Sequence, residues 1–191
     1  MKKKVLISAP YMHYEKAKVL KYLSKYDWDV TWVPVNERLE EQDLINVLPG
    51  YHGIICGDDR FSARVYEHTK DLRVVVKWGT GIDSINKPEA EKKGIKVFRT
   101  PNAFTIPVAE TTIGYMLSFA RKLNENDNIL KNGGWDKPKG FTLNESVIGI
   151  IGFGDIGKAV TKRLSNFCAK VLVYDVRDIK QEAANFTCQI V

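Results

Sequence analysis

Residues 147–160 read VIGIIGFGDIGKAV, in which an apolar run of strand length stops at spaced glycines and an amphipathic helical pattern begins. The glycines are Gly152, Gly154 and Gly157, in the spacing G-x-G-x-x-G of a dinucleotide-binding turn. In such a turn the first glycine permits the tight bend, the second lets a pyrophosphate approach the backbone, and the third lets the helix lie against the strand. The sequence therefore predicts a phosphate-binding turn; a glycine turn that serves only packing is the alternative.

Two features beside the glycines indicate which nucleotide would bind. The first helical N–H groups, those of Asp155 and Ile156, are expected to face the pyrophosphate, with the Asp155 side chain pointing outward. A second apolar run at residues 170–174 ends at Asp175, about 20 residues after the glycines. Because a carboxylate there accepts hydrogen bonds from the adenosine ribose hydroxyls and repels a 2′-phosphate, NAD is predicted over NADP.

The composition is that of a folded protein of one or two domains. Of the 191 residues, 44% are hydrophobic, enough for a core, and the net charge of +6 is spread along the chain. We interpret the lysines at 2–4 as a solvated N-terminus rather than a nucleic-acid site. Since no stretch resembles a membrane helix or the apolar core of a signal peptide, a cytoplasmic protein without membrane contact is expected.

The cysteines are few and show no metal-binding spacing. Cys56, Cys168 and Cys188 are odd in number and form no C-x-x-C pair. We therefore expect neither a disulfide framework nor a metal site, and a reducing compartment.

Strand and helix patterns alternate through the first half of the chain. Ser62 is the expected N-cap of one helix, and Gly94 is expected to close the next. Five strands alternating with helices predict an α/β fold, a flavodoxin-like doubly wound parallel sheet in residues 1–100. The glycine turn lies outside this sheet, so residues 101–191 are expected to hold the opening βαβ of a Rossmann nucleotide-binding domain. The expected strands are 5–8, 29–33, 53–56, 72–77 and 95–98, and the expected helices are about 13–25, 39–48, 62–69 and 88–94.

One long helix is expected between the two domains. Pro107 with Glu110 is typical of a helix start, and Gly133-Gly134 of a stop. Apolar residues cover more than one face, which favours burial against the sheet and against a second subunit, hence a homodimer. Packing within one chain is the alternative.

A second glycine turn follows the fourth expected strand. Gly79, Thr80 and Gly81 would place backbone N–H groups around an anion, and ligands of open α/β sheets bind beyond the carboxyl ends of the strands. This turn is a candidate for holding a substrate carboxylate that faces the nicotinamide. A plain strand-to-helix turn is the alternative.

Four stretches of the chain resemble the D-isomer-specific 2-hydroxyacid dehydrogenases. They are WGTGID at 78–83, TPN at 100–102, VAETTIG at 108–114 and IGIIGFGDIGK at 148–158, and they keep the family's spacing. The sequence is most similar to the phosphoglycerate dehydrogenase branch. The resemblance implies an oxidoreductase that transfers a hydride between NAD and C2 of a small 2-hydroxy or 2-oxo acid.

The resemblance also implies roles for single residues. Gly79 and Gly81 match the turn whose backbone holds the substrate carboxylate, and Thr80 matches a position that also touches the cofactor. Asp155 and Ile156 match the pair at the pyrophosphate, where the family more often has Arg before Ile.

The remaining matches concern the ribose, the dimer and the chemistry. Asp175 matches the ribose-binding acid, and the helix after Pro107 matches the family's dimer contact. By resemblance, an Arg clamps the substrate while a carboxylate-held His moves the proton, and these residues are expected beyond Val191. We therefore expect a C-terminally truncated chain that is inactive alone and carries no catalytic residue. The histidines present match no family motif and are His13, His52 and His68.

The sequence leaves three functions open. The first is an NAD-dependent D-2-hydroxyacid dehydrogenase, or the N-terminal part of one. The second is a non-catalytic NAD-sensing or protein-binding module, and the third is a dimerisation fragment. The 2-hydroxy acid stays undetermined, because Arg60, Lys77 and Arg99 lie near strand ends and suit either a substrate phosphate or solvent.

Overall fold

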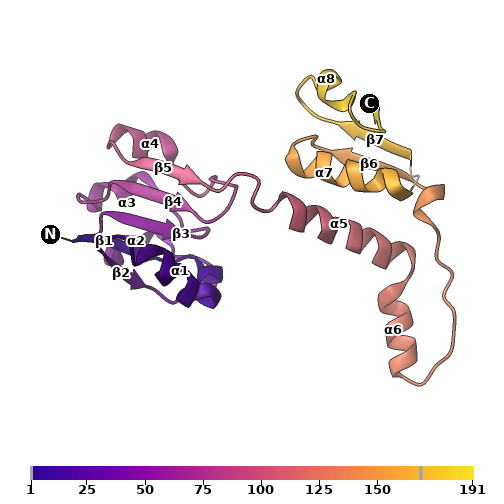
Figure 1. Cartoon of the computed structure of the whole chain (residues 1–191), viewed down its shortest axis with the longest axis horizontal. Coiled ribbons are helices and arrows are strands. Elements are labelled where there is room, and N and C mark those ends of the chain that lie inside the picture. Colours follow the sequence, from indigo (N-terminus) through magenta and orange to yellow (C-terminus); the bar gives the residue numbers. More distant parts are fainter. Residues whose placement is uncertain (1, 168–169) are drawn as a thin grey trace. The chain divides into compact units, whose positions relative to one another are not determined.

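The computed structural model describes residues 2–167 and 170–191, so Cys168 lies outside the described residues. The chain divides into two compact units, Met1–Ala103 and Phe104–Val191 (Figure 1). Each unit is built on a sheet whose strands all pair in parallel, which confirms the predicted α/β class. Within the described residues no helix is long and apolar enough to cross a membrane.

The first unit is a five-stranded sheet in the order β2-β1-β3-β4-β5. This is the flavodoxin-type order, whose switch point lies between β1 and β3. The strands are β1 (Lys3–Ile7), β2 (Trp28–Trp32), β3 (Gly53–Cys56), β4 (Val74–Lys77) and β5 (Lys96–Arg99). The helices are η1 (Pro10–Glu15), α1 (Lys16–Leu23), α2 (Glu41–Val47), α3 (Ala63–His68) and α4 (Lys87–Lys92).

The core of this unit lies between the central strands and the helices α2 and α3. Leu6, Ile54 and Val75 come from three neighbouring strands and pack with Leu44 and Val65 of the helices. All five side chains are almost completely buried. Their burial is the main favourable contribution to folding, and it explains why the central strands read as apolar runs.

The predicted N-cap of α3 is at the right residue, but it does not make the capping hydrogen bond. Ser62 occupies the N-cap position, but its hydroxyl makes no capping bond and donates to the carboxylate of Glu41. The same carboxylate accepts a bond of 2.7 Å from Arg64. Because α2 and α3 contact one another, the Ser62 hydroxyl donates to a charged acceptor, and such a hydrogen bond is stronger than one between neutral groups.

The long helix expected after Pro107 is broken into two, which corrects that prediction. Lys122 adopts a left-handed conformation with φ of 57° and ends the first helix. The returning chain closes on this end, because the amide of Phe141 donates to the carbonyl oxygen of Ala120 at 2.9 Å. At Gly140 a Cβ would lie only 2.4 Å from that oxygen, so glycine allows the approach. The two helices are α5 (Thr105–Ala120) and α6 (Leu123–Lys131).

The second unit has a three-stranded sheet in the order β6-β7-β8. Helix α5 lies beside α7, as Figure 1 shows, and buries Ala109 and Ile113 in a core that includes Phe153, Leu164 and Val173. This packing joins the linking helix to the nucleotide motif. The remaining elements are η2 (Leu143–Glu145), β6 (Val147–Ile151), α7 (Asp155–Leu164), η3 (Ser165–Phe167), β7 (Lys170–Tyr174), α8 (Lys180–Ala183) and β8 (Gln189–Ile190).

Candidate nucleotide-binding site

The turn between β6 and α7 needs glycine at its first position. Gly152 has φ of 95°, a conformation that side chains other than glycine rarely adopt. Its amide donates to the carbonyl oxygen of Tyr174 at 2.7 Å, which ties the turn to the end of β7. Gly154 is the N-cap of α7, and a Cβ there would meet no atom within 4 Å. The space beside Gly154 is therefore open to a ligand.

Gly157 brings the helix against the turn. A Cβ built on Gly157 would lie 2.2 Å from the carbonyl oxygen of Gly152, far inside van der Waals contact. The first turn of α7 therefore touches backbone directly, and no larger residue fits without moving the helix.

The N-terminus of α7 offers amides to an anion. The first bond of the helix runs from Lys158 N to Gly154 O at 2.9 Å. In the part of the chain that the structure describes, the amides of Asp155, Ile156 and Gly157 have no hydrogen-bond partner, as at a helix start without a side-chain cap. Unpaired amides at the positive end of the helix dipole suit a pyrophosphate.

Asp175 lies at the same edge as the glycine turn. Strands β6 and β7 pair with Ile151 opposite Tyr174, so the residues that follow both strands meet. The Oδ2 atom of Asp175 accepts a hydrogen bond of 2.7 Å from the amide of Phe153, inside the glycine turn. The structure thus brings together Gly152, Gly154, Asp155, Ile156, Gly157 and Asp175.

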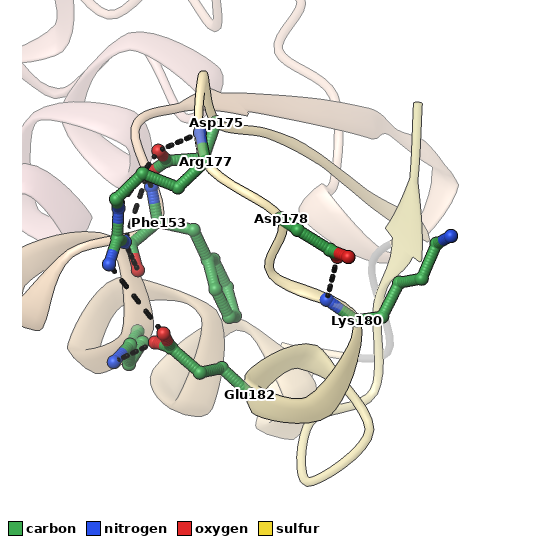
Figure 2. Close-up of polar contacts among 7 residues, drawn as sticks. Phe153, Asp175, Arg177, Asp178, Lys180 and Glu182 are labelled. Atoms are coloured by element: carbon green, nitrogen blue, oxygen red, sulfur yellow. Dashed lines mark hydrogen bonds and ion pairs between the residues drawn. The ribbon is translucent and has the colours of Figure 1, made fainter.

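Arg177 holds the other positions around the Asp175 carboxylate (Figure 2). Oδ1 accepts from the Arg177 amide at 3.0 Å and from Nε at 3.2 Å, and Oδ2 accepts from Nη2 at 3.2 Å. These bonds, first that of the guanidinium, hold the pKa of Asp175 well below its usual range. Arg177 Nη1 lies 3.6 Å from Glu182 Oε1, and Glu182 also pairs with Lys158.

Arg177 and Glu182 lie at this site but were not predicted from the sequence. Glu182 lies on α8, a single turn too short for hydrophobic periodicity to reveal. The one available signal was the position of Arg177, two residues after the predicted ribose acid.

The turn Gly79–Gly81 belongs to the first unit and is fixed to the end of β5. The carbonyl oxygen of Gly79 accepts from the amide of Thr100 at 3.0 Å, and that of Thr80 accepts from Arg99 Nη1 at 3.0 Å. These contacts occupy carbonyl groups of the turn and none of its amides. A substrate carboxylate at this turn, and a cofactor contact of Thr80, stay predictions.

The three basic candidates near this turn differ in their surroundings. Lys77 is buried, and its amine donates to the carbonyl oxygen of Gly57 at 2.6 Å and pairs with Asp58. Arg99 is held by Thr80. Arg60 lines an open cavity of about 250 Å³ that Gly81 also lines. Of the three, Arg60 therefore has the best access to a ligand at the turn.

The histidines have backbone partners. His13 Nε2 lies 3.1 Å from the carbonyl oxygen of Val33, and His68 Nδ1 lies 2.8 Å from that of Arg64. His52 Nδ1 accepts from the amide of Lys4 at 3.1 Å. Across residues 2–167 and 170–191 none of them pairs with a carboxylate, and no group of side chains there could hold a metal ion.

The sequence profile of the D-isomer specific 2-hydroxyacid dehydrogenases, catalytic domain, matches residues 5–187. The chain therefore belongs to this family, as its motifs indicated.

Individual relatives carry several activities in their names. The chain is 41% identical to a glyoxylate reductase of Thermofilum pendens, covering 76% of this chain and 43% of the relative. It is 35% identical to a hydroxypyruvate reductase of Thermotoga maritima, and the match covers 80% of this chain and 50% of that relative. It is 31% identical to a D-3-phosphoglycerate dehydrogenase of Methanocaldococcus jannaschii, and the match covers 98% of this chain and 35% of that relative. The chain thus spans half or less of these relatives, and their names do not single out one substrate.

Solved structures share the fold. A protein of Thermus thermophilus matches with a TM-score of 0.84 at 25% identity, covering 98% of this chain and 59% of that one. A D-lactate dehydrogenase of Aquifex aeolicus, complexed with NAD and lactic acid, matches with a TM-score of 0.83 at 21% identity, covering 98% and 55%. At 21% identity, the match to the D-lactate dehydrogenase supports a shared fold and nothing further.

Proposed function

We propose that this chain forms the substrate-type and NAD-binding parts of an NAD-dependent oxidoreductase that acts on the CH–OH group of a D-2-hydroxy acid, phosphoglycerate dehydrogenase-like. One observation carries the proposal: the carboxylate of Asp175 lies 2.7 Å from the amide of Phe153 in the glycine turn. The ribose acid and the free amides of α7 therefore belong to one site. Residues 1–100 would serve the substrate and residues 101–191 the NAD.

In this proposal the chain binds the pyrophosphate and the adenosine ribose of NAD. The amides of Asp155 and Ile156 bind the pyrophosphate, and Asp175 binds the adenosine ribose. NAD, when bound, supplies or accepts the hydride, while the protein positions and polarises. The backbone of Gly79 and Gly81 holds the substrate carboxylate, and Thr80 contacts both ligands.

We expect the chain alone to bind NADH weakly but saturably and to give no turnover. The expected inactivity follows from the histidines, since each has a backbone partner and none pairs with a carboxylate within the described residues. Calorimetric titration with NADH, followed by assays with glyoxylate, hydroxypyruvate and 3-phosphohydroxypyruvate, tests both parts. Absence of binding would overturn the proposal, whereas oxidation of NADH would overturn only the inactivity.

The second candidate is a non-catalytic NAD-sensing or dimerisation module, and exposed aromatic residues on α5 favour it. Tyr115 and Phe119 are 73% and 68% exposed, on a helix whose residues Ala109 and Ile113 enter the core of the second unit. Apolar side chains gathered on one helix are typical of a subunit contact. Both candidate functions therefore include a homodimer.

A charge placed on this side of α5 should dissociate the dimer. We expect Tyr115→Glu to weaken association about tenfold or more, because a buried carboxylate without a partner is costly. Light scattering after size exclusion measures the mass across a dilution series. Tyr22→Glu is the control, since Tyr22 is 62% exposed on α1 of the first unit. A wild-type chain that is monomeric at every concentration would contradict the proposed dimer.

A further inference from the structure

The Asp175 carboxylate has no free acceptor while Arg177 is in place. An ionised carboxylate offers about four acceptor positions, two on each oxygen. Oδ1 accepts twice from Arg177, through its amide and its Nε, and Oδ2 accepts from the Phe153 amide and from Arg177 Nη2. Ribose hydroxyls can therefore reach this acid only after the guanidinium of Arg177 has moved away.

Arg177 also changes what the acid presents to a ligand. The Asp175 side chain is only 9% exposed, whereas that of Arg177 is 54% exposed. A ligand arriving at this corner thus meets a guanidinium before it meets a carboxylate. The repulsion by which a ribose acid excludes a 2′-phosphate is reduced, because the positive charge lies closer to the surface.

In the described part of the chain, one N–H group of Nη1 remains available on the guanidinium of Arg177. Arg carries five N–H groups, and the described contacts of Arg177 use Nε, Nη2 and one weaker approach of Nη1 to Glu182. The planar guanidinium also matches the oxygens of a phosphate. A 2′-phosphate can therefore bind Arg177 without competing for Asp175.

Glu182 gives the guanidinium a second acidic partner. Glu182 lies on the other side of Arg177 from Asp175 (Figure 2). Lys158 of α7 pairs with Glu182 as well. When ribose hydroxyls take the acceptors of Asp175, Arg177 keeps Glu182 as a carboxylate partner, so its displacement does not leave the guanidinium unpaired. Arg177 can therefore either bind Asp175 or pair with Glu182 alone.

Building on the dinucleotide site proposed above, we propose that Arg177 is a specificity-determining residue: it competes with the adenosine ribose of NAD for Asp175 and binds the 2′-phosphate of NADP, so that the site accepts both cofactors. This extends the simpler expectation from Asp175 alone, in which NADP is repelled.

Opposite changes in two affinities test this role. NAD and NADP are titrated calorimetrically into the whole chain as wild type and as Arg177→Gln. We expect the variant to bind NAD severalfold more tightly and NADP about tenfold more weakly, since one charge-assisted contact to phosphate is lost. The control Lys180→Gln removes the same charge from an amine that points away from the cluster, and should leave the ratio within about twofold (Figure 2).

The outcomes separate this inference from the proposed function. If the wild type binds neither dinucleotide, both fall together. If the wild type binds NAD but Arg177→Gln leaves the ratio of the two affinities unchanged, or weakens both equally, Arg177 only supports the fold of the turn and this inference alone is overturned. An equal shift in Lys180→Gln would assign the effect to general charge and overturn the role of Arg177.

Discussion

Replacing Gly157 with alanine should destabilise the second unit by about 3 kcal/mol and abolish dinucleotide binding. The added Cβ would lie 2.2 Å from the carbonyl oxygen of Gly152. The backbone fixes the position of the Cβ, and the oxygen is itself a backbone atom, so no rotation of a side chain relieves the contact. Helix α7 must move away from the turn, and its free amides move with it. Urea denaturation followed by circular dichroism, with NADH titration, measures both consequences.

Gly149→Ala is the matched control for this prediction. Gly149 lies on β6 of the same motif, and a Cβ there would meet no atom within 4 Å. The control should change stability by less than about 1 kcal/mol and keep NADH binding. If Gly157→Ala is as stable as the control and still binds, the close packing of α7 on the turn is not what the site requires.

The local parts of the candidate nucleotide site were predictable because their signals are local. Three glycines in a fixed spacing determine the bend and the start of α7, and apolar runs determine β6 and β7. Parallel pairing then brings Asp175 to the turn, as its position at the end of a strand predicts. The alternation of strands and helices likewise predicted a parallel, doubly wound sheet in the first unit, because few topologies are compatible with it.

The features that were missed depend on contacts between distant residues. The break at Lys122 accompanies the hydrogen bond from Phe141 to the end of α5, and helix periodicity contains no information on that bond. The hydroxyl of Ser62 prefers Glu41, which only the packing of α2 on α3 brings near. Arg177 is close to Asp175 in sequence, yet its bonds to both carboxylate oxygens depend on side-chain conformation.

Asp175→Ala should weaken NADH binding by about 30-fold or more, because the ribose hydroxyls lose a charged acceptor. The change also leaves the amide of Phe153 without its acceptor and Arg177 with Glu182 as its acidic partner. Calorimetric titration compares the variant with Asp178→Ala, whose carboxylate lies on the same loop and accepts from the amide of Lys180 at 3.1 Å. An unchanged, strong affinity in Asp175→Ala would remove this acid from the site.

The pH dependence of NADH binding provides a check on the same carboxylate. The Arg177 guanidinium and the two backbone amides lower the pKa of Asp175 in the folded chain. A lowered pKa means that the contribution of the ionised form to stability is present above the unfolded pKa, about 3.9, and is lost only as pH falls through the folded pKa. The acid therefore stays ionised even at pH 4, and the affinity of the wild type for NADH should be flat between pH 8 and about 4. A loss of affinity that titrates near pH 4 to 5, and that disappears in Asp175→Ala, would show that these hydrogen bonds do not hold the carboxylate in solution.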